Sequence, residues 1–128
     1  MKLDDSSYPA NWLKIAEKDW GRVKHLLDVR DPEAAGFYLQ QSVEKFIKAF
    51  LLSKGWNLQK THALEKLLNE ALIYDPTLEE SRAIRQKITA FYFIDRYPFV
   101  TDVFLTEDDI RSSLPQVEMF IKKLKTTM

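Results

Sequence analysis

Apolar residues recur at intervals of three and four along most of this 128-residue chain. The first such series consists of Trp12, Ala16, Trp20, Val23 and Leu27. This period places apolar side chains on one face of an α-helix, whereas a half-buried strand needs alternate apolar residues. No strand-like alternation extends beyond about four residues. The pattern therefore predicts an all-α protein in which each helix buries one face.

Glycine and proline are rare and stand where helices are expected to start and stop. Asp31 followed by Pro32 predicts a helix start, because Asp can accept a hydrogen bond from a first-turn amide and Pro lacks the N–H that would go unsatisfied there. Gly55 predicts the end of that helix near Lys54. The expected helices are one that begins after Pro9, one over 32–54, one capped by Thr61, one over 76–95 and one after Thr106.

The last expected helix has the most regular apolar pattern. Its apolar residues are Ile110, Leu114, Val117, Ile121 and Leu124. Thr106 and Asp109 have the spacing of a capping box, with Asp in place of the usual Glu or Gln. Pro115 removes one backbone hydrogen bond, so it predicts either a kink or a helix that starts near Leu114.

Together these elements predict an up-and-down four-helix bundle with a fifth, C-terminal helix packed on it. A chain of 128 residues, 45% of them hydrophobic, suits one domain. We expect that domain to span residues 1–128, with residues 1–8 as a flexible N-terminus.

Charge and cysteine content exclude several classes of protein. The chain has 19 Lys and Arg against 19 Asp and Glu, so it does not bind nucleic acid through bulk positive charge, although a local basic patch stays open. It has no cysteine and two histidines, which excludes disulfides, a cysteine nucleophile and thiolate or histidine-rich metal sites. We therefore expect no metal and no cofactor.

No segment resembles a membrane span or a signal peptide. The longest apolar cluster, over 46–52, contains Lys48 and is far shorter than the ~20 residues that a span requires. The N-terminus lacks the apolar core of a signal peptide. We expect a cytoplasmic protein with no membrane contact.

The helix expected over 32–54 has two distinct faces. Its core face comprises Leu39, Val43, Phe46, Ile47, Ala49 and Phe50. The opposite arc is polar and comprises Gln41, Glu44, Lys45 and Lys48, bordered by Phe37, Tyr38 and Leu52. One interpretation is a solvated face on which Glu44 and Lys48 pair across one helical turn. The other is a ligand or partner surface, with lysines for phosphate and aromatic side chains for bases.

Four segments of the chain resemble the HEPN family (higher eukaryotes and prokaryotes nucleotide-binding). They are Ala16-Glu17-Lys18-Asp19, the run from Phe37 through Gln41, Glu44, Lys45 and Lys48 to Ala49, His62-Ala63-Leu64, and Arg96-Tyr97-Pro98. The resemblance extends from the first helix to Pro98. It implies a helical bundle that is usually a homodimer, and a member of the kind paired with minimal nucleotidyltransferases in toxin–antitoxin-like systems.

Family members that are RNases carry an Arg-x(4–6)-His motif where the fourth helix ends. Here Arg96 matches the arginine, but Thr101, Asp102 and Val103 occupy the positions of the histidine. The resemblance therefore implies a non-catalytic module that binds nucleotide or RNA, or a helical partner of a minimal nucleotidyltransferase. Two alternatives stay open. One is a metal-independent RNase that uses Arg96 with a non-standard base, His62 or Asp102, and the other is a purely structural protein–protein adaptor.

The resemblance and the polar arc supply candidate site residues. For nucleotide or RNA contact they are Arg96, Tyr97, Lys45, Lys48 and His62. For a partner or dimer surface they are Phe37, Gln41, Glu44 and Arg96. No catalytic residue or metal ligand is assigned. If the third and fourth helices are antiparallel neighbours, the start of the third lies beside the end of the fourth, which would bring His62 towards Arg96.

Overall fold

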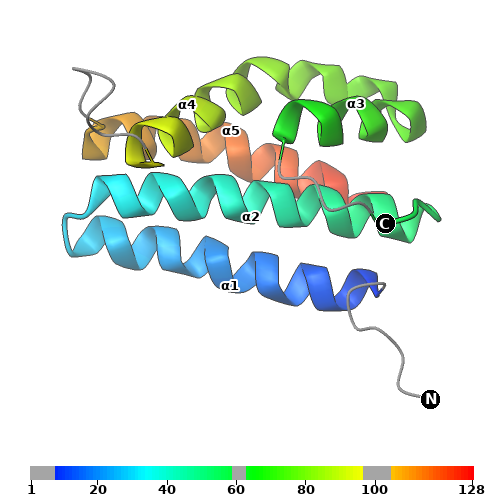
Figure 1. Ribbon diagram of the computed structural model, residues 1–128, viewed down its shortest axis with the longest axis horizontal. Coiled ribbons are helices and arrows are strands. Elements are labelled where there is room, and N and C mark those ends of the chain that lie inside the picture. Colours follow the sequence, from blue (N-terminus) through cyan, green and yellow to red (C-terminus); the bar gives the residue numbers. More distant parts are fainter. Residues whose placement is uncertain (1–7, 59–62, 97–104) are drawn as a thin grey trace.

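The computed structural model describes residues 8–58, 63–96 and 105–128, with only the backbone of residues 92–96. Within these ranges the chain is helical and contains no strand. The elements are α1 (Pro9–Asp28), α2 (Pro32–Ser53), α3 (Leu64–Tyr74), the short 3-10 helix η2 (Pro76–Ser81), α4 (Arg82–Arg96) and α5 (Glu107–Thr126). The prediction of an all-α bundle with five α-helices is confirmed (Figure 1).

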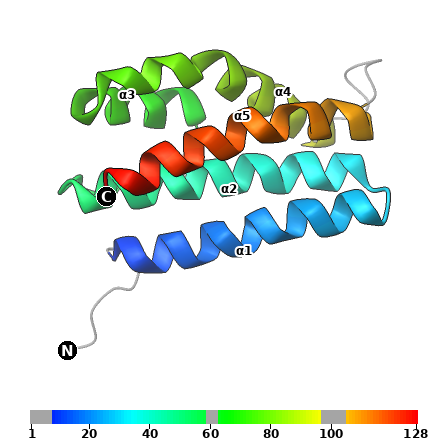
Figure 2. The ribbon, with the colours of Figure 1, turned by 180° about the vertical axis from the view of Figure 1, so that it is seen from behind.

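Helix α2 lies at the centre of the bundle and contacts all four other α-helices. Helix α1 runs antiparallel to α2 along one side of it, while α3, η2 and α4 lie on the other side and α5 runs alongside (Figures 1 and 2). The α1–α2 connection, the end of α4 and the start of α5 share one end of the bundle. Of the helices in the described ranges, none combines the length and apolar character that crossing a bilayer requires.

The predicted core face of α2 is confirmed, since all six of its residues are at most 1% exposed. Gly36 allows α2 to pack closely against the chain that leads into α5. A Cβ atom at this position would lie 2.7 Å from Leu105 Cδ2 and 3.2 Å from Ile110 Cδ1. A larger residue would therefore force these side chains apart.

The predicted helix starts at Asp31 and Thr106 are confirmed, and Asp75 also caps a helix, although a 3-10 helix and not α4. The Asp31 side chain accepts a hydrogen bond from the Ala34 amide at 3.3 Å, and Asp75 accepts one from the Thr77 amide at 3.1 Å. Thr106 and Asp109 form a reciprocal capping box.

Three details differ from the predictions. Asp75 and Pro76 open the 3-10 helix η2, and α4 itself begins at Arg82. Helix α5 begins at Glu107 and continues through Pro115, so it does not start near Leu114. Helix α3 begins at Leu64, after Ala63, which provides no side-chain cap, and the predicted cap Thr61 lies outside the described residues.

Candidate functional site

The polar arc of α2 is not a solvated face. Glu44 is 1% exposed and Lys48 is 2% exposed, so the interpretation of a solvated face is wrong for both residues, although they do pair across one helical turn. Gln41 and Lys45 are half-buried. The reason is the central position of α2, which leaves little of its circumference free.

Lys48 is enclosed between α1 and α2. Its Nζ atom lies 4.0 Å from Glu44 Oε1 and 4.9 Å from the centroid of the Trp12 ring. Burial lowers the pKa of Lys48, and this effect exceeds the opposite effect of the Glu44 carboxylate. The amine is thus held inside the bundle by an acid and an aromatic face.

Lys45 belongs to a different set of contacts, one turn earlier on α2. The carboxylate of Asp19, on α1, is fully buried and accepts hydrogen bonds from Lys45 Nζ and Arg22 Nη1. We call these three residues the Asp19 cluster. Two cations around one carboxylate carry a net charge of +1, and the side chains of Arg22 and Lys45 are 42% and 20% exposed. The buried acid therefore holds two cations that reach the surface.

Aromatic and amide side chains of α2 adjoin the Asp19 cluster. The guanidinium of Arg22 lies 5.3 Å from the centroid of the Tyr38 ring, and the Phe37 ring meets Tyr38 edge-to-face at 5.2 Å. Gln41 follows Phe37 by one turn and precedes Lys45 by one turn, so it lies on the same side of the helix. We call Arg22, Lys45, Phe37, Tyr38 and Gln41 the cationic-aromatic face; all five side chains are partly accessible.

The sequence interpretation included Lys45, Phe37 and Gln41 but missed Asp19 and Arg22 as site residues. A signal for Asp19 was present. It lies three residues after Ala16 and four before Val23, which places a carboxylate on the apolar face of α1. A buried carboxylate requires cationic partners, and Arg22 follows it by one turn.

Three candidate residues are only partly placed or not placed by the structure. His62 and Tyr97 lie outside the described residues, and for Arg96 the structure describes only the backbone. Arg96 ends α4, at the end of the bundle that also holds the α1–α2 connection (Figures 1 and 2). The binding role of these three residues stays a prediction.

The start of α3 does not lie beside the end of α4. Glu65, in the first turn of α3, pairs with Arg82 and Arg85 in the first turn of α4. Arg96 follows Arg85 by about 16 Å along the helix axis, at a rise of about 1.5 Å per residue. The expected neighbourhood is wrong because α3 has only 11 residues and packs against η2 and the beginning of α4.

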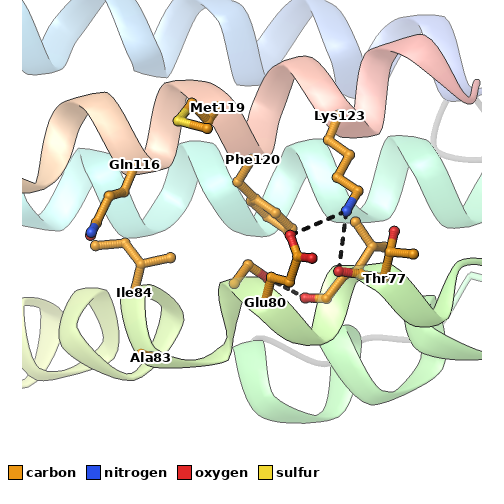
Figure 3. A pocket seen from close by; sticks show the side chains of 10 residues that line it. Thr77, Glu80, Ala83, Ile84, Gln116, Met119, Phe120 and Lys123 are labelled. Atoms are coloured by element: carbon orange, nitrogen blue, oxygen red, sulfur yellow. Dashed lines mark hydrogen bonds and ion pairs between the residues drawn. The ribbon is translucent and has the colours of Figure 1, made fainter.

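A groove of about 240 Å³ lies between η2, the start of α4 and α5 (Figure 3). Its apolar lining includes Leu78, Ile84 and Phe120, with Met119 at 71% exposure on α5. At one end, Lys123 Nζ donates to the Thr77 carbonyl at 3.1 Å and lies 3.7 Å from a Glu80 carboxylate oxygen. The groove can receive an apolar side chain next to a charged one.

The described residues contain no group of three or more His, Cys, Asp and Glu side chains placed to hold a metal ion.

Comparison with known proteins agrees with this architecture. A family model described as HEPN domain matches residues 10–127. Among solved structures, the crystal structure of TT1696 from Thermus thermophilus superposes with a TM-score of 0.77. The two chains are 20% identical, and the match covers 94% of this chain and 98% of that one, so the likeness shows the fold. No curated protein matches the chain.

Proposed function

The chain belongs to the HEPN family, and from this membership we propose that it is a non-catalytic helical module that binds nucleotide or RNA. The cationic-aromatic face is the observation that carries the proposal. There, Asp19 holds Arg22 and Lys45 beside the half-buried rings of Phe37 and Tyr38. Phosphate needs cationic donors and a base needs a flat apolar surface, and this face offers both.

The Asp19 cluster leaves donors free for a ligand. A guanidinium has five N–H donors and an ammonium has three, and Asp19 accepts one hydrogen bond from Arg22 and one from Lys45. Because both cations are already oriented by a buried carboxylate, phosphate binding costs less side-chain entropy than it would with free lysines. Arg96 and Tyr97 would extend the contact at the end of α4.

We expect no catalysis because of the sequence around Arg96. The expected histidine is replaced at all three motif positions, and the described part of α3 starts beside the beginning of α4. An RNase would need a general base close to Arg96.

We propose a symmetric homodimer in which the same surface of each protomer is used twice. Phe37 and Gln41 support it, since both stay half-buried on the cationic-aromatic face. Arg96 from each protomer would line a cleft between the two protomers. Glu44, which is inside the bundle, would act only by supporting this surface. Sedimentation at micromolar concentration tests the dimer, and a monomer would refute it.

The groove supports a second role, as the helical partner of a minimal nucleotidyltransferase. Its apolar lining and the exposed Met119 suit a protein side chain better than a phosphate. Co-purification with the product of a neighbouring nucleotidyltransferase gene tests this role. Met119→Asp should abolish co-purification and leave RNA binding unchanged.

Binding is tested by fluorescence anisotropy with a labelled single-stranded RNA and with labelled ATP. Two phosphate contacts predict that RNA affinity falls about sevenfold when salt rises fourfold, for example from about 50 to about 200 mM. Arg22→Gln should weaken binding, while Lys122→Gln, an equal loss of charge at an exposed position on α5, should not. If neither probe binds at the lower salt concentration, the proposed function is wrong.

A further inference from the structure

A second charged cluster joins the start of α3 to the start of α4. The Glu65 carboxylate contacts the guanidinium groups of both Arg82 and Arg85. Arg82 also forms two hydrogen bonds with Glu79, at 2.6 and 2.8 Å, and one with Asn69 at 2.9 Å. Arg82 is therefore well supplied with acceptors even without Glu65.

Arg85 is not. Its side chain is 5% exposed, its Nη2 is ion-paired with the Glu65 carboxylate, and its Nε has no hydrogen-bond partner. Nε and Nη2 form one edge of the guanidinium, whose spacing matches two oxygens of a carboxylate or phosphate. A buried edge of this kind is costly unless an oxyanion accepts from it.

The N-terminus of α3 adjoins this edge. The first-turn amides of an α-helix have no acceptor within the helix. These amides and the helix dipole favour a negative charge. Arg85 contacts Glu65, a residue of this first turn, so the guanidinium lies beside the start of α3.

We propose that Arg85, Arg82 and the first turn of α3 form a site for a phosphate group. The Glu65 carboxylate stands where phosphate oxygens would bind. Because the Glu65 side chain is 48% exposed, it can turn out to solvent and leave both guanidinium groups to the ligand. The site is separate from the cationic-aromatic face and does not depend on the proposed function.

The test is a titration of the ¹⁵N-labelled protein with inorganic phosphate, ATP and a short single-stranded RNA, each followed by NMR. We expect the amide signals of Leu64, Glu65 and Lys66 to shift with phosphate. Glu65→Gln removes the competing charge and keeps an acceptor for Arg82, so it should tighten phosphate binding about tenfold. A shift with phosphate and ATP alone assigns a small ligand, whereas a shift with RNA as well assigns the RNA backbone.

Arg85→Lys keeps the positive charge but removes the two-donor edge, and it should lose most of the binding. Arg111→Gln, at an exposed arginine paired with Glu107 on α5, is the matched control and should bind as the wild type does. The Glu65→Gln result decides the question even if Arg85→Lys does not fold. The proposal is wrong if these amides do not shift at roughly 20 mM phosphate, or if Glu65→Gln binds no tighter than the wild type.

Discussion

The α1–α2 pair and the α3–α4 pair each place one acid between two cations, but they bury opposite partners. In the Asp19 cluster the acid is fully buried, and the two cations reach the surface. At the start of α3 the acid, Glu65, is half-exposed, and the cation Arg85 is buried. In each cluster the buried group keeps its place and the exposed group can exchange partners. In the proposed binding modes, an anionic ligand would therefore add to the cations of the first cluster, whereas in the second it would replace the acid.

The largest expected difference in stability between the two clusters appears when the acid of each is removed. Asp19→Ala should lower the free energy of unfolding by about 3 kcal/mol, because it removes a buried carboxylate with two charged hydrogen bonds. Glu65→Ala should cost no more than about 1 kcal/mol, as is usual for an exposed ion pair. Urea unfolding followed by circular dichroism measures both. Equal losses would remove the distinction between the two clusters.

Removing one cation from each cluster should keep the same order, with the larger loss again in the Asp19 cluster. Lys45→Met leaves the buried Asp19 with Arg22 alone and should cost about 2 kcal/mol. Arg85→Met replaces a buried guanidinium, whose Nε has no acceptor, by an apolar side chain, and its effect should stay within about 1 kcal/mol. The same unfolding experiment applies. A loss of stability for Arg85→Met as large as that for Lys45→Met would show that the guanidinium donors of Arg85 are fully hydrogen-bonded in the folded protein.

Among the described residues, the alkaline pH dependence should arise from Lys48, on the α1–α2 side. The pKa of Lys48 in the folded chain is lowered from its ordinary value of 10.5. The unfolded chain therefore holds more protons on this residue, so stability should rise as the pH increases through the lowered pKa towards 10.5. The rise is limited to about 1.4 kcal/mol per pH unit. The rise should be absent in Lys48→Met. The prediction is contradicted if the stability of the wild type, relative to that of the variant, falls as the pH increases towards 10.5.

The smallest effect should be an acid dependence at the start of η2. The hydrogen bond from the Thr77 side chain lowers the pKa of Asp75 below 3.8, so its stabilising contribution is present above pH 3.8 and is lost as the pH falls through the lowered pKa. The Asp75 side chain is only partly buried, which keeps the effect to a few tenths of a kcal/mol. Comparison with Asp75→Asn in acid unfolding should show a difference that disappears at low pH. A difference that grows on acidification would have the wrong sign.

Features that depend on neighbouring residues in the chain could be predicted from the sequence. The core face of α2 and the capping box at Thr106 depend on local spacing, and both are confirmed. The burial of Lys48 could not be predicted, because it depends on which helix becomes central to the bundle. The pairing of Asp19 with Lys45 joins residues 26 positions apart, and helix periodicity carries no information on such a contact.

The short length of α3 explains why the expected approach of the third helix to Arg96 is wrong. Periodicity predicts the apolar stripe of α3 well, and Leu64, Leu67, Leu68 and Ala71 are all buried. It does not predict that Asp75 and Pro76 start a 3-10 helix, which shifts the register of α4 against α3. The neighbour of Glu65 is therefore Arg85 rather than the end of α4.

The central position of α2 has a consequence for how the molecule opens. Helix α1 packs almost entirely on α2, whereas α2 also supports every other α-helix. Detachment of α1 alone is therefore a partial unfolding event that the remaining helices can survive, while loss of α2 is global unfolding. Amide hydrogen exchange should be slowest in α2, and the amides of α1 should exchange together at a faster rate. Each such opening would free Arg22 and Trp12 at once, exposing Lys48 to water and dismantling the cationic-aromatic face in the same step.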